Sequence, residues 1–367
     1  MNWNLLIVAV AFAASIFVSA NLSLKTYNTD FPMYYSAAST ILDPEASPEN
    51  VYDAGAQNKY AIPERKEVET PYVYSLLVAF LFTPLAWMPY YTAKAVMIFL
   101  NIMAYLIAVA IILRVGNVSD RWIARGVAIS ILWLPFIHTL LYGQVNALIT
   151  VLVALAVLAV TRGHPYLCGI FIAFAALFKF FPLAIALVLG LRDRRIFVGC
   201  AVVFLATFLI PGSTKWISTI WNFLNEDKRT LTYIWVKAVS VVNPVLFFVY
   251  PAVIGVVTAF LAAMAKDDDY PLLTAYAITA VFLVMPRMGY YHLTLLVLAY
   301  AHLFSLKECR NWLFTGFLLL SAVVLGFPRR GAGLITPPIY IALFSLWVVV
   351  GVLISTRSYS RTPAAVA

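Results

Sequence analysis

The sequence predicts an all-α polytopic membrane protein. Hydrophobic residues make up 63% of the 367 residues, whereas charged residues make up only 11%. The mean hydropathy of +0.91 is higher than a water-soluble chain of this length needs for its core. Apolar runs approach the ~20 residues that cross a bilayer, without strand-like alternation, so we expect about twelve transmembrane helices. Together they would form one integral membrane domain over residues 1–367.

The first apolar run, residues 4–20, is expected to be a retained span. Its end, Val18-Ser19-Ala20, resembles a signal-peptide cleavage site, but no Lys or Arg precedes the run. The run leads into the stretch TDFPMYYSAAST at 29–40, which brings the carboxylate of Asp30 to the expected membrane edge.

Basic clusters indicate which turns between helices face the cytoplasm. One cluster contains Arg114, Arg121 and Arg125, and simple alternation of spans would place it on the same side as Asp30. The conflict disappears if residues 72–90 do not cross, and this segment is interrupted by proline and rich in aromatic residues. We therefore expect an interfacial or re-entrant helix there, on the outer side.

With this topology, residues 21–92 form a first outer loop with interfacial helices, and residues 212–237 form a second large outer loop. Residues 126–141 form one span that runs back to the outer side. The stretch 166–191 has basic turns at both ends, so we expect it to run outward and return. Its outermost point would be Lys179-Phe180-Phe181-Pro182. The tail, residues 356–367, is expected in the cytoplasm.

The topology gathers polar side chains from distant parts of the chain at the outer side. Cations in short outer turns run against the preference for cytoplasmic positive charge, and a site for an anionic phosphate would explain them. These cations are Lys179, Arg287, Arg329 and Arg330; the polar side chains beside them are Asp30, Gln144, Asn146 and His292. A carboxylate can accept a proton from a hydroxyl while cations stabilise a departing phosphate, so we expect group transfer from a lipid-linked phosphate.

An ordered set of short motifs runs through the same part of the chain. The motifs are Asp30-Phe31 with Tyr34-Tyr35 and Ala37-Ala38, Thr70-Pro71-Tyr72, Phe82-Thr83-Pro84-Leu85-Ala86, Tyr142-Gly143-Gln144-Val145-Asn146 and Phe178-Lys179-Phe180-Phe181-Pro182. In this order they resemble glycosyltransferase family 87. That family has the C-type fold of integral membrane glycosyltransferases and includes polyprenyl-phosphate-mannose-dependent mannosyltransferases.

The resemblance implies an inverting transfer of a sugar, with mannose as the first expectation, from a polyprenyl-phosphate donor to an acceptor hydroxyl. It assigns the general base to Asp30 and a further catalytic role to His292. The reaction would take place in the cell envelope, on the periplasmic or extracellular side of the inner or plasma membrane. Family members often carry Tyr-Pro-Pro where this chain has Thr70-Pro71-Tyr72. The acceptor therefore stays open among a glycolipid, a polysaccharide and a protein.

The site residues also have ordinary structural explanations. Asp30 could cap a helix, Lys179 could extend to lipid headgroups, and His292 could be a hydrogen-bonded structural residue. Arg329 and Arg330 could likewise bind headgroups.

Amides and tyrosines complete the expected site. Gln144 and Asn146 could line it or simply join helices by hydrogen bonds. The tyrosines expected to line the substrate are Tyr34, Tyr35, Tyr72 and Tyr291. The aromatic belt of the membrane interface would explain Tyr34 and Tyr35 equally well.

No metal site or other cofactor is expected, and dependence on a divalent metal stays open. The three cysteines have no CxxC spacing, and Asp267-Asp268-Asp269 falls in an expected cytoplasmic turn beside Lys266, where a solvated turn explains it. The formal charge of +9 is scattered over short turns, which suits contact with membrane lipids and not with nucleic acid. The oligomeric state stays open.

A transporter or flippase of an anionic lipid or solute is the alternative function. Such proteins often show repeats with Gly- or Pro-broken helices at matching positions in two halves. The sequence shows no such repeat, so a transferase is the favoured interpretation.

Overall fold

The computed structural model describes residues 30–60, 72–226, 246–265, 270–284, 290–307, 312–326 and 337–360, together with positions 13, 14, 17 and 21. Within these ranges the chain is helical and contains no strand. The helices, including the 3₁₀ helices η1 and η4, are α2 (Phe31–Leu42), η1 (Pro48–Tyr52), α3 (Ala54–Asn58), α4 (Leu76–Ala86), α5 (Tyr90–Val115), α6 (Asp120–Ser130), α7 (Leu134–Tyr142), α8 (Asn146–Thr161), α9 (Pro165–Phe178), α10 (Leu183–Gly190), α11 (Arg195–Phe208), α12 (Lys215–Glu226), α14 (Leu246–Met264), α15 (Tyr270–Val284), η4 (Tyr290–Leu295), α16 (Leu296–Ser305), α17 (Trp312–Gly326) and α18 (Pro337–Ser360).

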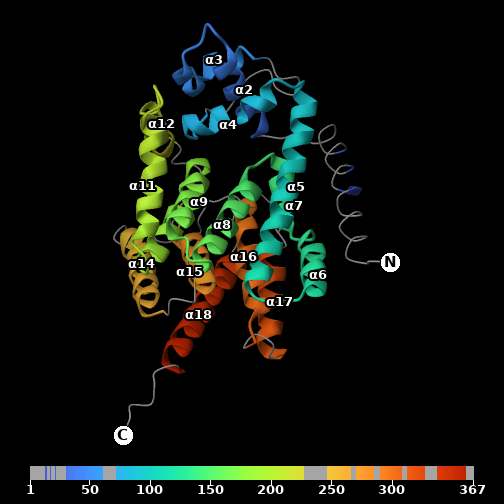
Figure 1. The fold of residues 1–367 in the computed structure, drawn as a ribbon, viewed down its shortest axis with the longest axis vertical. Coiled ribbons are helices and arrows are strands. Elements are labelled where there is room, and N and C mark those ends of the chain that lie inside the picture. Colours follow the sequence, from blue (N-terminus) through green and yellow to red (C-terminus); the bar gives the residue numbers. More distant parts are fainter. Residues whose placement is uncertain are drawn as a thin grey trace.

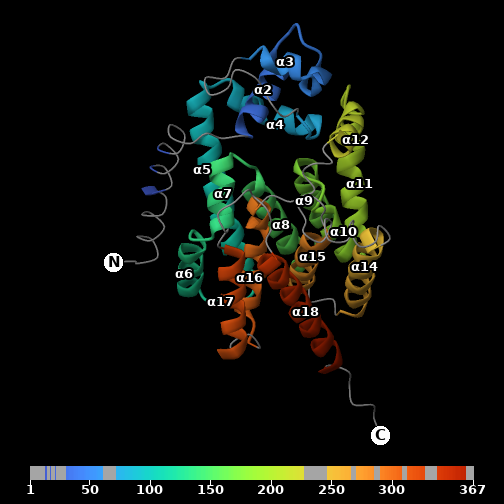
Figure 2. The ribbon, with the colours of Figure 1, turned by 180° about the vertical axis from the view of Figure 1, so that it is seen from behind.

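Long helices form a bundle, and short helices lie across one end of it. Figure 1 shows α2, α3 and α4 together above the bundle, with α4 crosswise to α5 and α11. The view from behind in Figure 2 shows the same arrangement, with α12 beside these short helices. We call residues 30–60 and 72–86 the cap.

The cap is held together by aromatic packing between α2 and α4. The ring of Tyr34 lies 5.0 Å from that of Tyr74 and 5.1 Å from that of Phe82. Prolines fix the ends of these helices: Pro32 occupies the first turn of α2, and Pro89 separates α4 from α5. The expected short helix in 72–90 therefore exists and lies crosswise, while the long helix α5 begins directly after Pro89.

The stretch expected to run out and back is a helical hairpin. Helices α9 and α10 are separated at Lys179-Phe180-Phe181-Pro182. A Cβ atom on Gly169, near the start of α9, would collide with the carbonyl oxygen of Ile196, at the start of α11. Because the starts of α9 and α11 lie together, α10 must return along α9 before α11 begins. The turn therefore lies at the opposite end, toward the cap.

Membrane crossing is only partly visible from helix length. Among the described helices, α5, with 26 residues, is long and apolar enough to span a bilayer alone. Helices α6 and α7 pass the same test together, but they are bent by 56°. Several other apolar helices have 10–17 residues. The architecture is all-helical as expected, and the count of about twelve spans stays a prediction.

Two segments differ from their expected form. Residues 126–141 were expected to be one span, but they are divided between α6 and α7, because Pro135 has no N–H to continue a helix from the preceding turn. The expected outer loop 212–237 contains the amphipathic helix α12. Its remaining residues after Glu226, and the tail after Ser360, lie outside the described residues.

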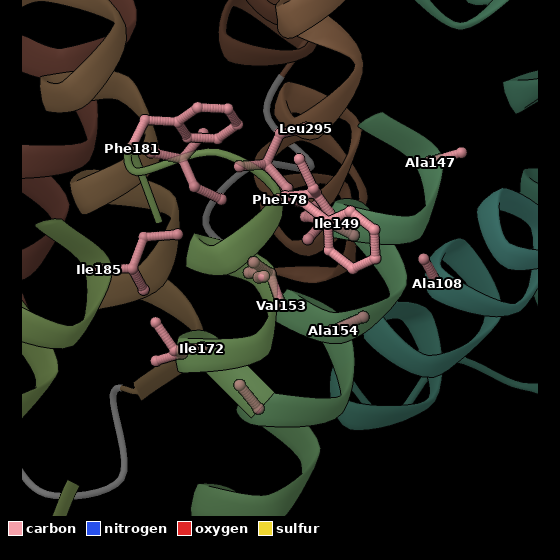
Figure 3. Close-up of a cluster of buried hydrophobic side chains, with 14 of the residues drawn as sticks. Ala108, Ala147, Ile149, Val153, Ala154, Ile172, Phe178, Phe181, Ile185 and Leu295 are labelled. Carbon is pink, nitrogen blue, oxygen red and sulfur yellow. The ribbon is translucent and has the colours of Figure 1, made fainter. Parts of the chain in front are cut away.

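A buried apolar cluster lies where α8, α9, α10 and η4 meet. Figure 3 shows Ile149 and Val153 of α8 beside Phe178, Phe181 and Leu295. All five side chains are buried. Lys179 lies between Phe178 and Phe181 in the chain. The burial of these two side chains in the cluster therefore holds the turn between α9 and α10 in place.

Candidate active site

The centre of the candidate site is the amino group of Lys179. Its Nζ donates hydrogen bonds to Oε1 of Gln144 at 2.6 Å and to Oδ1 of Asn146 at 3.2 Å. Nε2 of His292 lies 3.2 Å from the same nitrogen, and the ring centroid of Tyr291 lies 4.9 Å from it. Four residues expected at the outer side are therefore in contact with the lysine.

The turn between α7 and α8 presents the two amides. Gly143 ends α7 with φ of 65°, a left-handed conformation that glycine adopts without strain. The backbone N–H of Gln144 donates to the carbonyl of Thr139 at 2.9 Å, and this hydrogen bond closes the turn. Gln144 and Asn146 are each 1% exposed. Glycine in the Tyr-Gly-Gln-Val-Asn motif is therefore needed to turn both amides inward.

Tyr291 and His292 reach the lysine from η4. Thr139 of α7 donates to the carbonyl of Tyr291 at 3.3 Å, and its hydroxyl lies 2.8 Å from that of Thr294. Trp133 donates to the carbonyl of Leu293 at 3.2 Å. These contacts fix η4 against α7 although the two are far apart in sequence.

Asp30 lies beside the same turn. Its backbone N–H donates to the carbonyl of Tyr142 at 3.2 Å, and the ring of Tyr142 packs against that of Tyr291 at an angle of 48°, with centroids 5.6 Å apart. Asp30 occupies the N-cap position of α2, but its side chain makes no capping hydrogen bond. Helix capping therefore does not explain why a carboxylate occupies this position.

The charges of Asp30 and Lys179 act on each other. Removal of water around the Lys179 amino group lowers its pKa to about 7, and the negative charge of Asp30 opposes this decrease. Burial raises the pKa of Tyr74 well above its ordinary value, and the Asp30 charge adds to that increase. The charge of Asp30 is thus near enough to affect the pKa of both Lys179 and Tyr74.

The three tyrosines expected in the cap have different surroundings. Tyr34 is buried between Tyr74 and Phe82. The hydroxyl of Tyr72 donates to the carbonyl of Ser75 at 3.1 Å, and that of the partly buried Tyr35 donates to the carbonyl of Met88 at 2.8 Å. Tyr72 therefore hydrogen-bonds to the cap backbone and Tyr35 to the backbone just after α4, and their contact with substrate stays a prediction.

Tyr74 is a site residue that the sequence interpretation missed. It packs on Tyr34 with centroids 5.0 Å apart, and it lies within the electrostatic range of Asp30 and Tyr291. The pattern Tyr72-Val73-Tyr74 offered a signal, because alternate residues of an extended segment lie on one side.

One buried hydrogen-bond donor in the site is unused within the described residues: Nδ2 of Asn146 has no partner there. Such a donor beside a lysine suits an oxygen of a bound ligand. Three residues expected to bind phosphate, Arg287, Arg329 and Arg330, lie outside the described residues. In the described part of the chain, no three His, Cys, Asp or Glu side chains gather as a metal site.

Comparisons with known proteins bear on the same region. The sequence model of glycosyltransferase family 87 matches residues 72–286, which include Gln144, Asn146 and Lys179 and leave Asp30 and His292 outside. An alpha-(1->3)-arabinofuranosyltransferase of Corynebacterium glutamicum is 23% identical over 291 residues, covering 71% of this chain and 68% of that protein. No solved structure matches the chain.

Proposed function

Because this chain belongs to glycosyltransferase family 87, we propose that it transfers a sugar from a polyprenyl-phosphate donor to an acceptor hydroxyl at the outer face of a membrane. The family assignment makes the chain a glycosyltransferase; the donor, the side of the membrane and the residue roles are the proposal. The observation that carries it is the Lys179 amino group, held by buried amides and an imidazole beside the Asp30 carboxylate.

The donor phosphate would bind at Lys179 and Asn146. The hydrogen-bond acceptors around Lys179 in the structure are neutral groups of Gln144, Asn146 and His292. A phosphate oxygen is a stronger acceptor for an ammonium than these groups, because its negative charge adds Coulomb attraction to the hydrogen bond. Nδ2 of Asn146 supplies a further donor at the same position.

Asp30 would act as the general base. The acceptor hydroxyl gives its proton to the Asp30 carboxylate while its oxygen forms a bond to the anomeric carbon of the sugar. The bond from that carbon to the phosphate oxygen breaks, and its electron pair stays on the departing polyprenyl phosphate, which Lys179 stabilises. Attack from the face opposite the phosphate inverts the anomeric configuration.

His292 would position Lys179 and not exchange protons with the substrate. Its Nε2 faces the ammonium and accepts from it, which places the proton of the neutral ring on Nδ1. This differs from the catalytic role that the family resemblance implies for His292. Further binding by Arg287, Arg329 and Arg330 remains part of the proposal.

The identities of the transferred sugar and of the acceptor are also part of the proposal. The motif resemblance favours mannose, whereas the curated relative acts, by its name, on arabinofuranose. Both polyprenyl-phosphate sugars therefore belong in one assay, with a glycolipid, a polysaccharide and a protein as acceptors.

The decisive experiment measures release of polyprenyl phosphate. Purified protein in lipid nanodiscs is incubated with each donor and acceptor, and both products are quantified. We expect wild-type protein to release polyprenyl phosphate and Asp30→Asn to lose at least about 10²-fold in rate, in line with the loss of a general base. Donor binding by Asp30→Asn should be retained. Normal turnover by Asp30→Asn would refute the assignment, and movement of donor with its glycosidic bond intact would identify a transporter.

A further inference from the structure

Trp216 joins two segments that border the candidate site. It is 2% exposed and lies in the first turn of α12. Its ring stacks on Phe180 with centroids 4.9 Å apart and planes inclined by 12°. Its Nε1 donates a hydrogen bond to the carbonyl of Val73 at 3.2 Å.

The two partners of Trp216 adjoin opposite sides of the site. Phe180 directly follows Lys179, which holds the proposed phosphate position. Val73 directly precedes Tyr74, which lies within the electrostatic range of Asp30. A single indole therefore connects the backbone of the cap to the turn between α9 and α10.

The start of α12 is itself fixed. Gly212, in the turn between α11 and α12, has a φ of 84°, and the buried Ser213 donates from its hydroxyl to the carbonyl of Thr207 at 2.8 Å. A Cβ atom on Gly212 would lie 3.1 Å from the Cβ of Glu49 in the cap. Trp216 therefore follows a turn that connects α11 to α12 and contacts the cap.

We infer that Trp216 is a positioning residue that sets the separation between the Asp30 side and the Lys179 side of the site. The inference rests on the proposed function, in which these two residues act on opposite ends of one transfer. A displacement of about 1 Å between reacting groups can cost about 10²-fold in rate. A residue that touches both flanking segments therefore affects catalysis without touching the substrate.

Two variants separate the contacts of Trp216. Trp216→Phe keeps an aromatic ring against Phe180 but removes the donor to Val73, and Trp216→Ala removes both contacts. We expect roughly 3- to 10-fold lower kcat for Trp216→Phe, since one hydrogen bond is lost, with the donor KM changed less than about twofold. For Trp216→Ala we expect a decrease of roughly 30-fold or more. Trp122→Phe is the matched control, since Trp122 is exposed on α6.

Hydrogen exchange provides a readout that does not depend on turnover. The proposal predicts faster amide exchange in both 72–76 and 179–183 in Trp216→Ala, and in 72–76 mainly in Trp216→Phe. Unchanged exchange in both segments, or normal kcat in a folded Trp216→Ala protein, would overturn the inference. If wild-type protein releases no polyprenyl phosphate, the proposed function fails, while the exchange pattern still decides whether Trp216 couples the two segments.

Discussion

Nε2 of His292 lies 3.2 Å from Nζ of Lys179, across a sequence separation of 113 residues. An ammonium has no acceptor, so the imidazole nitrogen must accept, and a second proton on the ring would bring two positive charges together. His292 therefore has two possible roles, which can be tested separately: it positions the lysine, or it acts on the substrate.

Replacement of His292 tests these roles. His292→Phe removes the acceptor, and we expect the donor KM to rise roughly 10-fold, as expected for loss of a hydrogen bond to a charged group. His292→Gln, which keeps an acceptor, should recover part of the affinity. Steady-state kinetics with varied donor concentration measure both effects. A large fall in kcat with an unchanged donor KM would instead support a direct catalytic role.

The pH dependence of donor binding should reflect Lys179. Burial lowers the pKa of Lys179 to about 7, with Asp30 opposing the decrease. The protonated form binds an anionic phosphate, so donor KM should be lowest below pH 7 and should rise as the pH increases through that value. In Lys179→Arg, whose guanidinium stays charged, the rise near pH 7 should disappear. The donor KM is measured between pH 6 and pH 9, a range chosen for about one unit or more on either side of the transition. The same rise in Lys179→Arg would assign the pH dependence to another group.

Asn146→Asp is expected to weaken donor binding by roughly 10- to 100-fold. The aspartate keeps an acceptor for Lys179 but replaces the Nδ2 donor with a negative charge that repels phosphate. The thermal stability of the protein should be unchanged or higher, because the new carboxylate pairs with the lysine. Donor binding and thermal unfolding are measured on the same preparation. Wild-type affinity in this variant would exclude a phosphate beside Asn146.

Gly143→Ala should destabilise the folded protein. The φ of 65° at Gly143 costs about 1–2 kcal/mol for a residue with a side chain. Gly255→Ala is the control, since a Cβ atom at this helical position would meet no atom within 4 Å. We expect a lower unfolding temperature for Gly143→Ala and no decrease for Gly255→Ala. Equal unfolding temperatures would mean that the turn tolerates alanine.

Gly169→Ala should separate α9 from α11. The added Cβ atom would collide with the backbone of Ile196, and overpacking of this kind costs about 1–3 kcal/mol. Because α9 ends at the turn that carries Lys179, we expect transfer activity to fall together with the unfolding temperature. Gly316→Ala has open space and serves as the control. Full activity in Gly169→Ala would show that the turn does not depend on this helix contact.

The positions of charged residues and the alternating direction of the expected spans were enough to predict which residues lie at the same end of the molecule. Lys179, Gln144, Asn146 and His292 were expected on one side from topology alone, and the structure joins them by hydrogen bonds. Their roles in binding and catalysis remain to be tested by the variants above.

Other features depend on contacts between segments that the sequence keeps apart. Trp216 and Val73 are separated by 143 residues, and no local pattern in either segment encodes their hydrogen bond. The division of residues 126–141 was missed because their hydropathy is continuous, although Pro135 supplies the reason for the break. Tyr74 was missed although it lies on the same side of an extended segment as Tyr72, because its place near Asp30 depends on contacts between segments.

The glycine contact between α9 and α11 also bears on how such a site can diversify. With backbones touching at Gly169 and Gly199, no side chain can be enlarged there without moving the donor side as a whole. The cap, in contrast, presents an exposed polar position at Glu45, where substitution costs little stability. Under the proposed function, in which Lys179 binds the donor and Asp30 of the cap activates the acceptor, a lineage could therefore change the molecule that receives the sugar by altering the cap, while inheriting the contact between α9 and α11 intact.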